Sequence, residues 1–156
     1  MAVKRRDIEN RLREFEARCR ERGVPLTVQR REVLEAVLKR DDHPTADQLY
    51  DSLKERIPGL SRTTVYRVLE TLVNMGVIRR LHHPGTAARF DGKIHRHHHL
   101  VCKKCGKVID IHDATWNEVP FPEVRKEEFE IEDFSVHFTG ICAECRKKTS
   151  WKKKVD

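Results

Sequence analysis

The sequence predicts an α+β fold in two parts, a helical first part followed by a smaller part built around short strands. Apolar residues recur at helical spacing through most of the first part, which indicates amphipathic helices around a core. Four of the five cysteines fall in the second part as two CxxC pairs. The chain has 156 residues, a length that suits one domain or two small ones. We place the boundary after Asp91, so the expected domains are residues 1–91 and 92–156.

Three helices are expected before residue 60. Residues 7–22 and 26–40 each place apolar side chains on one face. In residues 43–56, Thr45 is followed three positions later by Gln48, which is the pattern of a capping box at a helix start.

Residues 61–76 are expected to form a fourth helix with two unlike faces. The apolar face consists of Val65, Val68, Leu69 and Leu72. The opposite face carries the candidate DNA-binding residues Arg62, Thr63, Thr64, Tyr66 and Arg67. In a major groove, Tyr66 can contact a base methyl and Arg67 a guanine edge. The alternative is a solvated basic helix, which is disfavoured because the basic residues share one face opposite the apolar stripe.

Residues 77–83 and 87–91 are typical of two short strands around a Pro-Gly turn. Small helices followed by a basic hairpin form the pattern of a winged helix-turn-helix, whose partner is double-stranded DNA. The net charge of +7 agrees with a polyanionic partner. Arg79, Arg80 and Arg89 of the hairpin are expected to approach the DNA backbone or the minor groove.

The second part predicts short strands at residues 97–102 and 107–112 and a longer one at residues 129–142. Residues 113–129 stay ambiguous because two prolines interrupt any helix there. The basic tail from residue 146 is expected to be frayed and solvated.

The cysteine pairs predict a structural metal site. Cys102 and Cys105 form one CxxC and Cys142 and Cys145 the other, and four thiolates at this spacing satisfy tetrahedral Zn²⁺ with no open position. A dithiol redox switch is the alternative. The fifth cysteine, Cys19, lies on the apolar stripe of the first helix and is expected to pack in the core.

A histidine-rich stretch precedes the first CxxC. Alternate residues of a strand share a face, so His97 and His99 are expected to point the same way and His98 the other way. Asp110 on the next strand is placed to meet them. Imidazole and carboxylate ligands suit Fe²⁺, Mn²⁺ or Zn²⁺. Strand geometry alone leaves two alternatives open, a metal site and a solvated loop that binds metal adventitiously.

Together these motifs resemble the ferric uptake regulator superfamily over about residues 18–148. The matching stretches are GVPLTVQRREVL, HPTADQLYDSL, SRTTVYRVLETLVNMGVI, RFD, HHHLVCKKCGKVID and GICAEC. The resemblance implies a metal-dependent transcriptional repressor that binds a palindromic DNA operator as a homodimer. Its second part would be the dimerisation and metal-binding domain.

Within the superfamily the chain resembles the peroxide-sensing repressors most. That resemblance implies a regulatory Fe²⁺ or Mn²⁺ ion in each subunit, beside one structural Zn²⁺. The ligands carried over to this chain are His43, Asp91, His97, His99 and Asp110. Iron-catalysed oxidation of His43 or His97 would then release the operator. Such oxidation is self-modification without turnover, so we do not expect an enzyme.

The alternative is an iron- or other divalent-metal-responsive repressor of metal uptake genes that does not sense peroxide. Asp110 favours peroxide sensing, because iron-sensing relatives tend to carry Glu there. Arg67 is more similar to the iron sensors. A third metal site, found in iron-sensing relatives, is in doubt here. Arg96 and His98 flank His97, and Asp133 or Phe134 stands where those relatives are expected to carry a further His.

Other histidines and other classes of protein complete the expectations. His82 and His83 are expected at the surface, while the roles of His95, His98, His112 and His137 stay open. The chain has no HExxH motif and no HxE paired with PCxxC, which argues against a zinc hydrolase or deaminase. It shows no signal peptide and no long apolar run, so we expect a cytoplasmic protein with no membrane partner.

Overall fold

A computed structural model describes residues 5–82, 85–125 and 128–152. It divides into two compact units, the first ending at Ile94 and the second beginning at His95. Helices dominate the first unit and a sheet organises the second, so the predicted α+β fold class is confirmed. His83 and Pro84 of the predicted hairpin turn lie outside the described residues.

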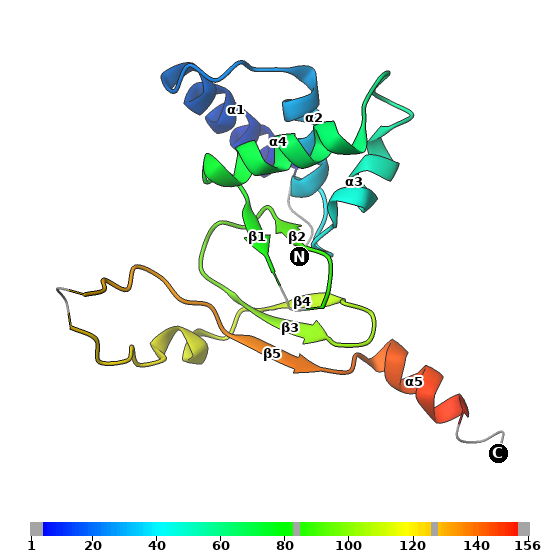
Figure 1. Cartoon of the computed structure of the whole chain (residues 1–156), viewed down its shortest axis with the longest axis vertical. Helices are drawn as coiled ribbons and strands as arrows, with labels where there is room; N and C mark the ends of the chain where they lie inside the picture. Colours follow the sequence, from blue (N-terminus) through cyan, green and yellow to red (C-terminus); the bar gives the residue numbers. More distant parts are fainter. Residues whose placement is uncertain (1–4, 83–84, 126–127, 153–156) are drawn as a thin grey trace. The chain divides into compact units, whose positions relative to one another are not determined.

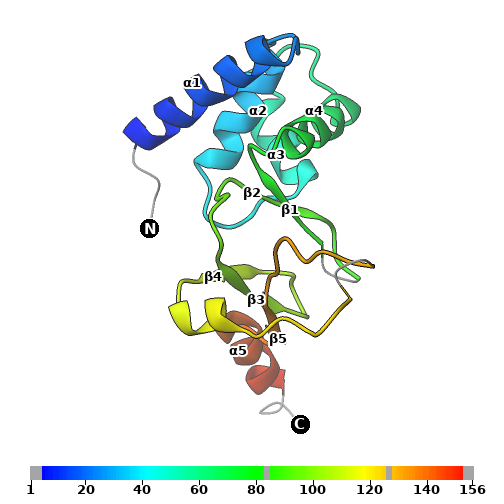
Figure 2. The same ribbon diagram turned by 90° about the vertical axis from the view of Figure 1, so that its left-hand side faces the viewer.

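The first unit consists of helices followed by a hairpin (Figure 1). Its elements are α1 (Arg5–Glu21), α2 (Val28–Leu38), α3 (Ala46–Leu53), α4 (Arg62–Asn74), β1 (Arg79–Leu81) and β2 (Arg89–Asp91). Helix α4 packs against both α2 and α3, as the perpendicular views of Figures 1 and 2 show. The two strands are antiparallel, with Arg80 opposite Phe90. This is the arrangement expected of a winged helix-turn-helix.

Side-chain caps fix where three of these helices begin. The predicted capping box is present: the Thr45 hydroxyl accepts the Gln48 backbone N–H at 3.3 Å, and the Gln48 side chain accepts the Thr45 N–H at 2.9 Å. Ser61 is the N-cap of α4, and its side chain accepts the Thr64 backbone N–H. At α2 the cap is Thr27, so this helix starts two residues later than the sequence pattern indicated.

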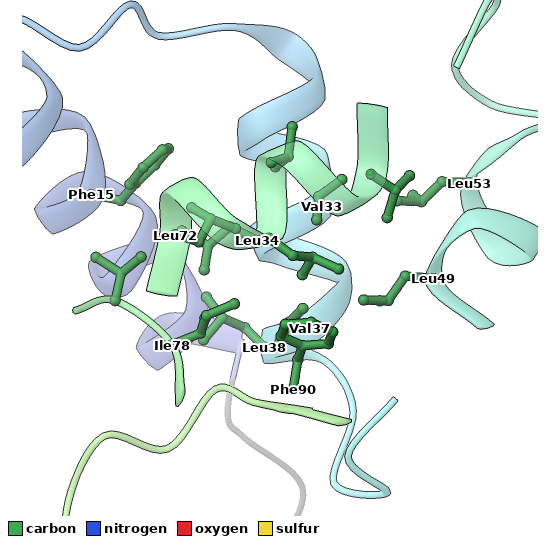
Figure 3. Close-up of a cluster of buried hydrophobic side chains, with 14 of the residues drawn as sticks. Phe15, Val33, Leu34, Val37, Leu38, Leu49, Leu53, Leu72, Ile78 and Phe90 are labelled. Carbon is green, nitrogen blue, oxygen red and sulfur yellow. The ribbon is translucent and has the colours of Figure 1, made fainter. Parts of the chain in front are cut away.

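The core of the first unit gathers side chains from all four helices and the hairpin (Figure 3). Phe15, Val33, Leu34, Val37, Leu49 and Leu72 are each fully buried. All members of the predicted α4 stripe are buried as well. Cys19 is 1% exposed within this cluster, as predicted, and burial raises the pKa of its thiol. A protonated, inaccessible thiol agrees with a packing role.

Arg11 ties the segment that follows the hairpin to α1. Its guanidinium donates to the Val77 carbonyl at 2.7 Å and to the Gly92 carbonyl at 2.9 Å. A Cβ at Gly92 would lie 3.0 Å from the Leu38 Cδ2 atom and 3.4 Å from its Cα atom, so glycine permits this close approach to α2. The chain is thereby held against the first unit as far as Gly92.

The second unit is organised by a three-stranded sheet. Strand β3 (His98–Cys102) lies between β4 (Val108–Ile111), which is antiparallel to it, and β5 (His137–Gly140), which is parallel. A short 3-10 helix, η1 (Ala114–Glu118), follows β4, and α5 (Ala143–Lys152) follows β5. Few apolar side chains are buried here: Val101, Cys102 and Val108. So small a core predicts a strong dependence on bound metal.

Two expectations for the second unit were wrong. The strand predicted at residues 129–142 is shorter in the structure, where β5 covers His137–Gly140, and the N–H of Val136, directly before β5, donates to the His98 side chain. Only the Val136 carbonyl joins the ladder, accepting the His99 N–H at 3.0 Å. The basic tail, expected to be frayed and solvated, is helical in α5 as far as Lys152; residues 146–148 are exposed as expected, and residues 153–156 lie outside the described residues.

Candidate metal centres

The four CxxC cysteines converge on one point in the second unit. Their sulfur atoms all lie within 4.8 Å of one another. The Cys105 and Cys142 sulfurs are 3.8 Å apart. A tetrahedral zinc ion with Zn–S bonds of about 2.3 Å requires sulfur–sulfur edges of about 3.8 Å, whereas a disulfide requires about 2.05 Å. The convergence of all four sulfurs on one point, and not of two alone, fits a metal ion better than a dithiol switch.

Backbone turns hold these sulfurs in place. Gly106 adopts a φ of +68°, and its N–H donates to the Cys102 carbonyl at 2.8 Å, which closes the first CxxC turn. The Lys103 N–H donates to the Gly140 carbonyl at 2.9 Å, and the Cys142 N–H donates to the Cys102 sulfur at 3.3 Å. The end of β3 is thus hydrogen-bonded to the end of β5, which brings the two CxxC pairs together.

Two of the four clustered thiols, Cys102 and Cys145, have shifted pKa values. The Cys142 N–H, followed by that of Cys105, lowers the pKa of Cys102 to about 6, so this sulfur ionises readily. Hydrogen bonds to Cys142 and Cys105 raise the pKa of Cys145 to about 12. Four thiolates this close repel one another, and a divalent cation removes that penalty. The donor set therefore fits Zn²⁺.

A second group of ligand-type side chains lies on β4 and at the start of β3, with His97 directly before that strand. The Nε2 atoms of His97 and His99 are 3.1 Å apart. The Asp110 Oδ1 atom lies 3.5 Å from the Nε2 of His97 and 3.7 Å from that of His99. Strand register explains the meeting, because His99 and Asp110 are directly opposite each other. Both histidines are buried, so a solvated loop does not describe this stretch.

The tautomer of His97 suits metal binding. Its Nδ1 atom lies 2.9 Å from the His95 carbonyl, which can only accept, so Nδ1 carries the proton. The Nε2 atom then presents a lone pair toward His99 and Asp110. This carbonyl contact is the kind that orients metal-bound histidines in proteins.

The first unit contains its own imidazole–carboxylate pair. The Nε2 atom of His43 lies 3.6 Å from the Oδ2 atom of Asp91, and both side chains are buried. The other Asp91 oxygen accepts the Lys93 N–H at 2.8 Å. This hydrogen bond fixes the carboxylate, so that Oδ2 faces His43.

The predicted regulatory ligands therefore form two sets, one in each unit. The donors are three imidazole nitrogens and two carboxylate oxygens, which suit Fe²⁺, Mn²⁺ or Zn²⁺ and differ in kind from the four thiolates. Adjacent ligands of a six-coordinate ion with bonds of about 2.1 Å lie about 3 Å apart, which the His97–His99 separation matches. The chemistry of the donors fits a divalent regulatory ion.

His98 serves the fold, a role that the sequence left open. Its Nδ1 atom accepts the Val136 N–H at 3.1 Å, so the proton is on Nε2, which donates to Asn117 Oδ1 at 3.1 Å. The ring stacks on Phe134 with centroids 5.8 Å apart. As expected from strand alternation, His98 points away from His97 and His99.

The region in which a third metal site was doubted is filled by other contacts. Arg96 pairs with Asp133 at 2.9 Å, and its guanidinium lies 4.7 Å from the Phe134 ring centroid. Across the described residues, clusters of metal-ligand side chains are limited to the cysteine set and the His/Asp set.

The exposed face of α4 carries the predicted DNA-binding residues. Thr63, Tyr66 and Arg67 are exposed to solvent. Arg62 is engaged on the protein surface, where it pairs with Asp47 at 3.0 Å and its guanidinium lies 4.5 Å from the Tyr50 ring centroid. The Thr64 hydroxyl lies 2.9 Å from that of Ser61, the cap of the helix.

The arginines of the hairpin are also engaged. Arg80 pairs with Glu70 of α4. Arg89, for which a contact with the DNA backbone or minor groove stays a prediction, donates to the His43 carbonyl at 2.9 Å. One feature of the sequence could have indicated that Arg89 lies near the candidate ligands. It stands two residues before Asp91 and therefore on the same side of a short strand.

Comparisons with known proteins place the chain among metal-responsive regulators. The model of the ferric uptake regulator family matches residues 21–147. The peroxide-responsive repressor PerR of Staphylococcus aureus strain USA300 is 32% identical over 148 residues, which cover 95% of this chain and 100% of that protein. The predicted resemblance is thereby confirmed.

Solved structures give the same result for the fold. The ferric uptake regulator Fur of Helicobacter pylori, described as having three functional metal binding sites, has a TM-score of 0.74 at 23% identity, covering 94% of this chain and 97% of that one. A zinc uptake regulator complexed with zinc and DNA has a TM-score of 0.60 at 25% identity, covering 92% and 97%. None of the described helices is long and apolar enough to span a lipid bilayer.

Proposed function

The chain belongs to the ferric uptake regulator family, and from that premise we propose that it is a metal-dependent transcriptional repressor that senses peroxide. Its first part, residues 1–91, binds DNA and ends in a hinge, and its second part, residues 92–156, holds metal and dimerises. The supporting observation is the pair of buried imidazole–carboxylate sets, distinct from the cysteine cluster. A purely structural zinc module needs only the cysteines.

The cysteine cluster stabilises the second part. Cys102, Cys105, Cys142 and Cys145 hold one Zn²⁺ per subunit with no position open to a substrate. The spacing of their sulfurs and the small apolar core beside them support this role.

The regulatory ion joins the two parts. In this proposal, His43 and Asp91 would bind the same Fe²⁺ or Mn²⁺ ion as His97, His99 and Asp110. Ligands from both units then favour one relative orientation of the units and shift the population toward it. In a homodimer, that orientation sets the separation of the two α4 helices, which must match two half-sites of a palindromic operator.

An exposed apolar sheet face supports dimerisation through the second part. Leu100 and Ile109 are 44% and 45% exposed, and they are directly opposite each other on β3 and β4. Phe138 of β5 pairs with Leu100 on the other side. Exposed apolar patches of this kind mark association surfaces.

The exposed face of α4 reads the operator. Tyr66 and Arg67 contact base edges, while Thr63, Thr64 and Arg62 contact phosphates or bases near the helix start. The ion pair of Arg62 with Asp47 is exposed and therefore weak enough to be exchanged for a phosphate. The zinc uptake regulator solved with zinc and DNA supports DNA as the partner.

Peroxide acts on the ligands themselves. When bound at this site, Fe²⁺ would supply electrons for reductive cleavage of peroxide, a chemistry that Mn²⁺ would not supply. The net change inserts one oxygen atom into a ring C–H bond of His43 or His97 and releases water. The oxidised imidazole is a poorer ligand, so the two units lose their common orientation and the operator is released. Two observations support peroxide as the signal. One relative, 32% identical, is named a peroxide-responsive repressor, and the residue at position 110 is an aspartate.

One experiment tests the proposal. Protein loaded with Fe²⁺ or Mn²⁺ is exposed to a low dose of peroxide, and oxygen addition is mapped by peptide mass spectrometry alongside operator binding. We expect oxygen on the peptide containing His43 or His97, with loss of DNA binding, for iron only. Release without histidine oxidation, or oxidation confined to cysteines, contradicts peroxide sensing through these ligands.

Asp110→Glu separates peroxide sensing from the alternative, an iron- or other divalent-metal-responsive repressor of metal uptake genes. The longer carboxylate keeps an oxygen ligand but changes its reach, so the variant should retain Mn²⁺-dependent operator binding and respond less to peroxide. The response is the fraction of histidine oxidised at a fixed peroxide dose. An unchanged response removes the main reason for preferring peroxide, and Arg67, which resembles the iron sensors, then favours the alternative.

A further inference from the structure

The backbone of His43 has an unusual conformation. Its φ is +51°, and it is the single non-glycine residue with positive φ in the part of the chain that the structure describes. A side chain with a Cβ rarely adopts this left-handed region unless neighbouring contacts hold it there. His43 also pairs with Asp91, so its conformation bears directly on the metal ligands.

Those neighbouring contacts come from strand β2. The Arg89 Nη1 atom donates to the His43 carbonyl at 2.9 Å and reaches the Asp42 carbonyl at 3.4 Å. The next residue, Phe90, donates its N–H to the Pro44 carbonyl at 3.0 Å. Arg89 also forms an isolated antiparallel bridge with Thr45.

The same strand therefore serves both ligands of the first unit. Asp91 is a residue of β2, and Arg89 of the same strand donates a hydrogen bond to the carbonyl of His43. Arg89 is half-buried, and a planar guanidinium can reach two carbonyls from one fixed position. A lysine has a single ammonium group on a flexible side chain, so it would hold the Asp42 and His43 carbonyls less well.

We propose that Arg89 is a positioning residue for the regulatory metal and is not a DNA contact. By holding the His43 backbone, it keeps the imidazole facing Asp91 before any ion binds. This inference rests on the proposed function, in which His43 and Asp91 are ligands. Two consequences follow: the affinity for the regulatory ion depends on Arg89, and so does the division of oxidation between His43 and His97.

The test compares Arg89→Gln and Arg89→Lys with Arg80→Gln, which removes the same charge from the neighbouring strand. Zinc-loaded, full-length proteins are titrated with Mn²⁺ without DNA, and unbound Mn²⁺ is followed by electron paramagnetic resonance. We expect Arg89→Gln to weaken Mn²⁺ binding about 10- to 100-fold, as loss of a ligand-orienting contact does in other metal sites. Arg89→Lys should be intermediate, and Arg80→Gln should bind Mn²⁺ like the wild type.

Operator binding at saturating Mn²⁺ separates positioning from DNA contact. Arg89→Gln should then lose no more operator affinity than Arg80→Gln. An unchanged Mn²⁺ affinity combined with a larger loss of operator affinity would show a DNA contact and overturn the proposal. With Fe²⁺ and peroxide, the ratio of oxidised His43 to oxidised His97 should fall in Arg89→Gln, and an unchanged ratio counts against it.

His43→Ala in the same titration distinguishes the two levels of the argument. If His43→Ala binds Mn²⁺ like the wild type, the proposed regulatory site fails and this inference falls with it. If His43→Ala loses affinity while both Arg89 variants keep it, only the role of Arg89 is overturned. The zinc content and thermal unfolding of each variant verify that it is folded, and Arg89→Lys carries the test if Arg89→Gln does not fold.

Discussion

Adjacent histidines at and just before the start of β3 divide between proposed metal binding and structure. The side chains of His97 and His99 lie close to Asp110. Both ring nitrogens of His98, by contrast, form hydrogen bonds, one with the Val136 N–H and one with the Asn117 side chain. Alternation along a strand imposes this division, because a side chain cannot serve both faces. At the scale of single residues, the role of a histidine in this chain follows from the face on which it lies.

His98→Ala should therefore destabilise the second unit without removing the regulatory site. It leaves the half-buried Val136 N–H without its acceptor, which costs about 1 kcal/mol, at the lower end of the range for an unsatisfied buried group. Urea unfolding should report the loss, while Mn²⁺ binding to folded protein stays near that of the wild type. The matched control, His97→Ala, should show the reverse. A large loss of Mn²⁺ affinity in His98→Ala would place this residue among the ligands.

Helix caps show how local chemistry positions the DNA-reading element. Ser61 adopts an extended conformation and accepts the Thr64 N–H at 3.0 Å, and this fixes the first turn of α4. The candidate DNA contacts lie directly after that cap. At the scale of elements, the start of α4 was predictable because capping depends on residues three positions apart.

Ser61→Ala should lower the unfolding free energy by about 0.5–2 kcal/mol, the usual effect of losing an N-cap. The same substitution should weaken operator binding, because the first turn of α4 frays where Arg62 to Thr64 must be ordered. Ser61→Thr keeps the acceptor and serves as the control. Denaturant unfolding and operator titration check both effects, and equal stability of the alanine and threonine variants would contradict the role of the cap.

The two units differ in what holds each of them together. The first has an extensive apolar core that draws on all its helices, whereas the second buries few apolar side chains and brings four cysteines to one point. Apolar burial stabilises by roughly 25 cal/mol per Å², so a small core leaves much of the stability to the metal. At the scale of the whole molecule, stability is expected to be uneven.

Removal of zinc should therefore unfold the second unit while the first stays helical. Chelation, or Cys105→Ser, should abolish protection of β3 to β5 from hydrogen exchange and abolish dimerisation, with α1 to α4 remaining protected. Sedimentation and hydrogen exchange check the two effects. Cys19→Ser, which alters a cysteine outside the cluster, should keep both the zinc and the dimer. Protected strands in zinc-free protein would contradict the dependence on metal.

The sequence by itself determined helices α1 to α4, the capping box of α3, the cysteine pairs and the separation of His98 from His97 and His99. Each of these depends on residues a few positions apart, where helical and strand periodicity and short-range hydrogen bonds act. The strand predicted at residues 129–142 failed for the opposite reason. The strand itself is limited to β5, and the Val136 N–H before it is bound by the side chain of His98, which is distant in sequence.

Only the tertiary structure decided how the first unit holds His43 beside Asp91. That geometry requires β2 to lie beside the loop before α3. There, Arg89 donates to the His43 carbonyl and the Phe90 N–H donates to the Pro44 carbonyl. Neither the positive φ of His43 nor the role of Arg89 leaves a periodic pattern in the sequence. Contacts between distant segments are fixed by packing of the whole unit, and short-range periodicity does not record them.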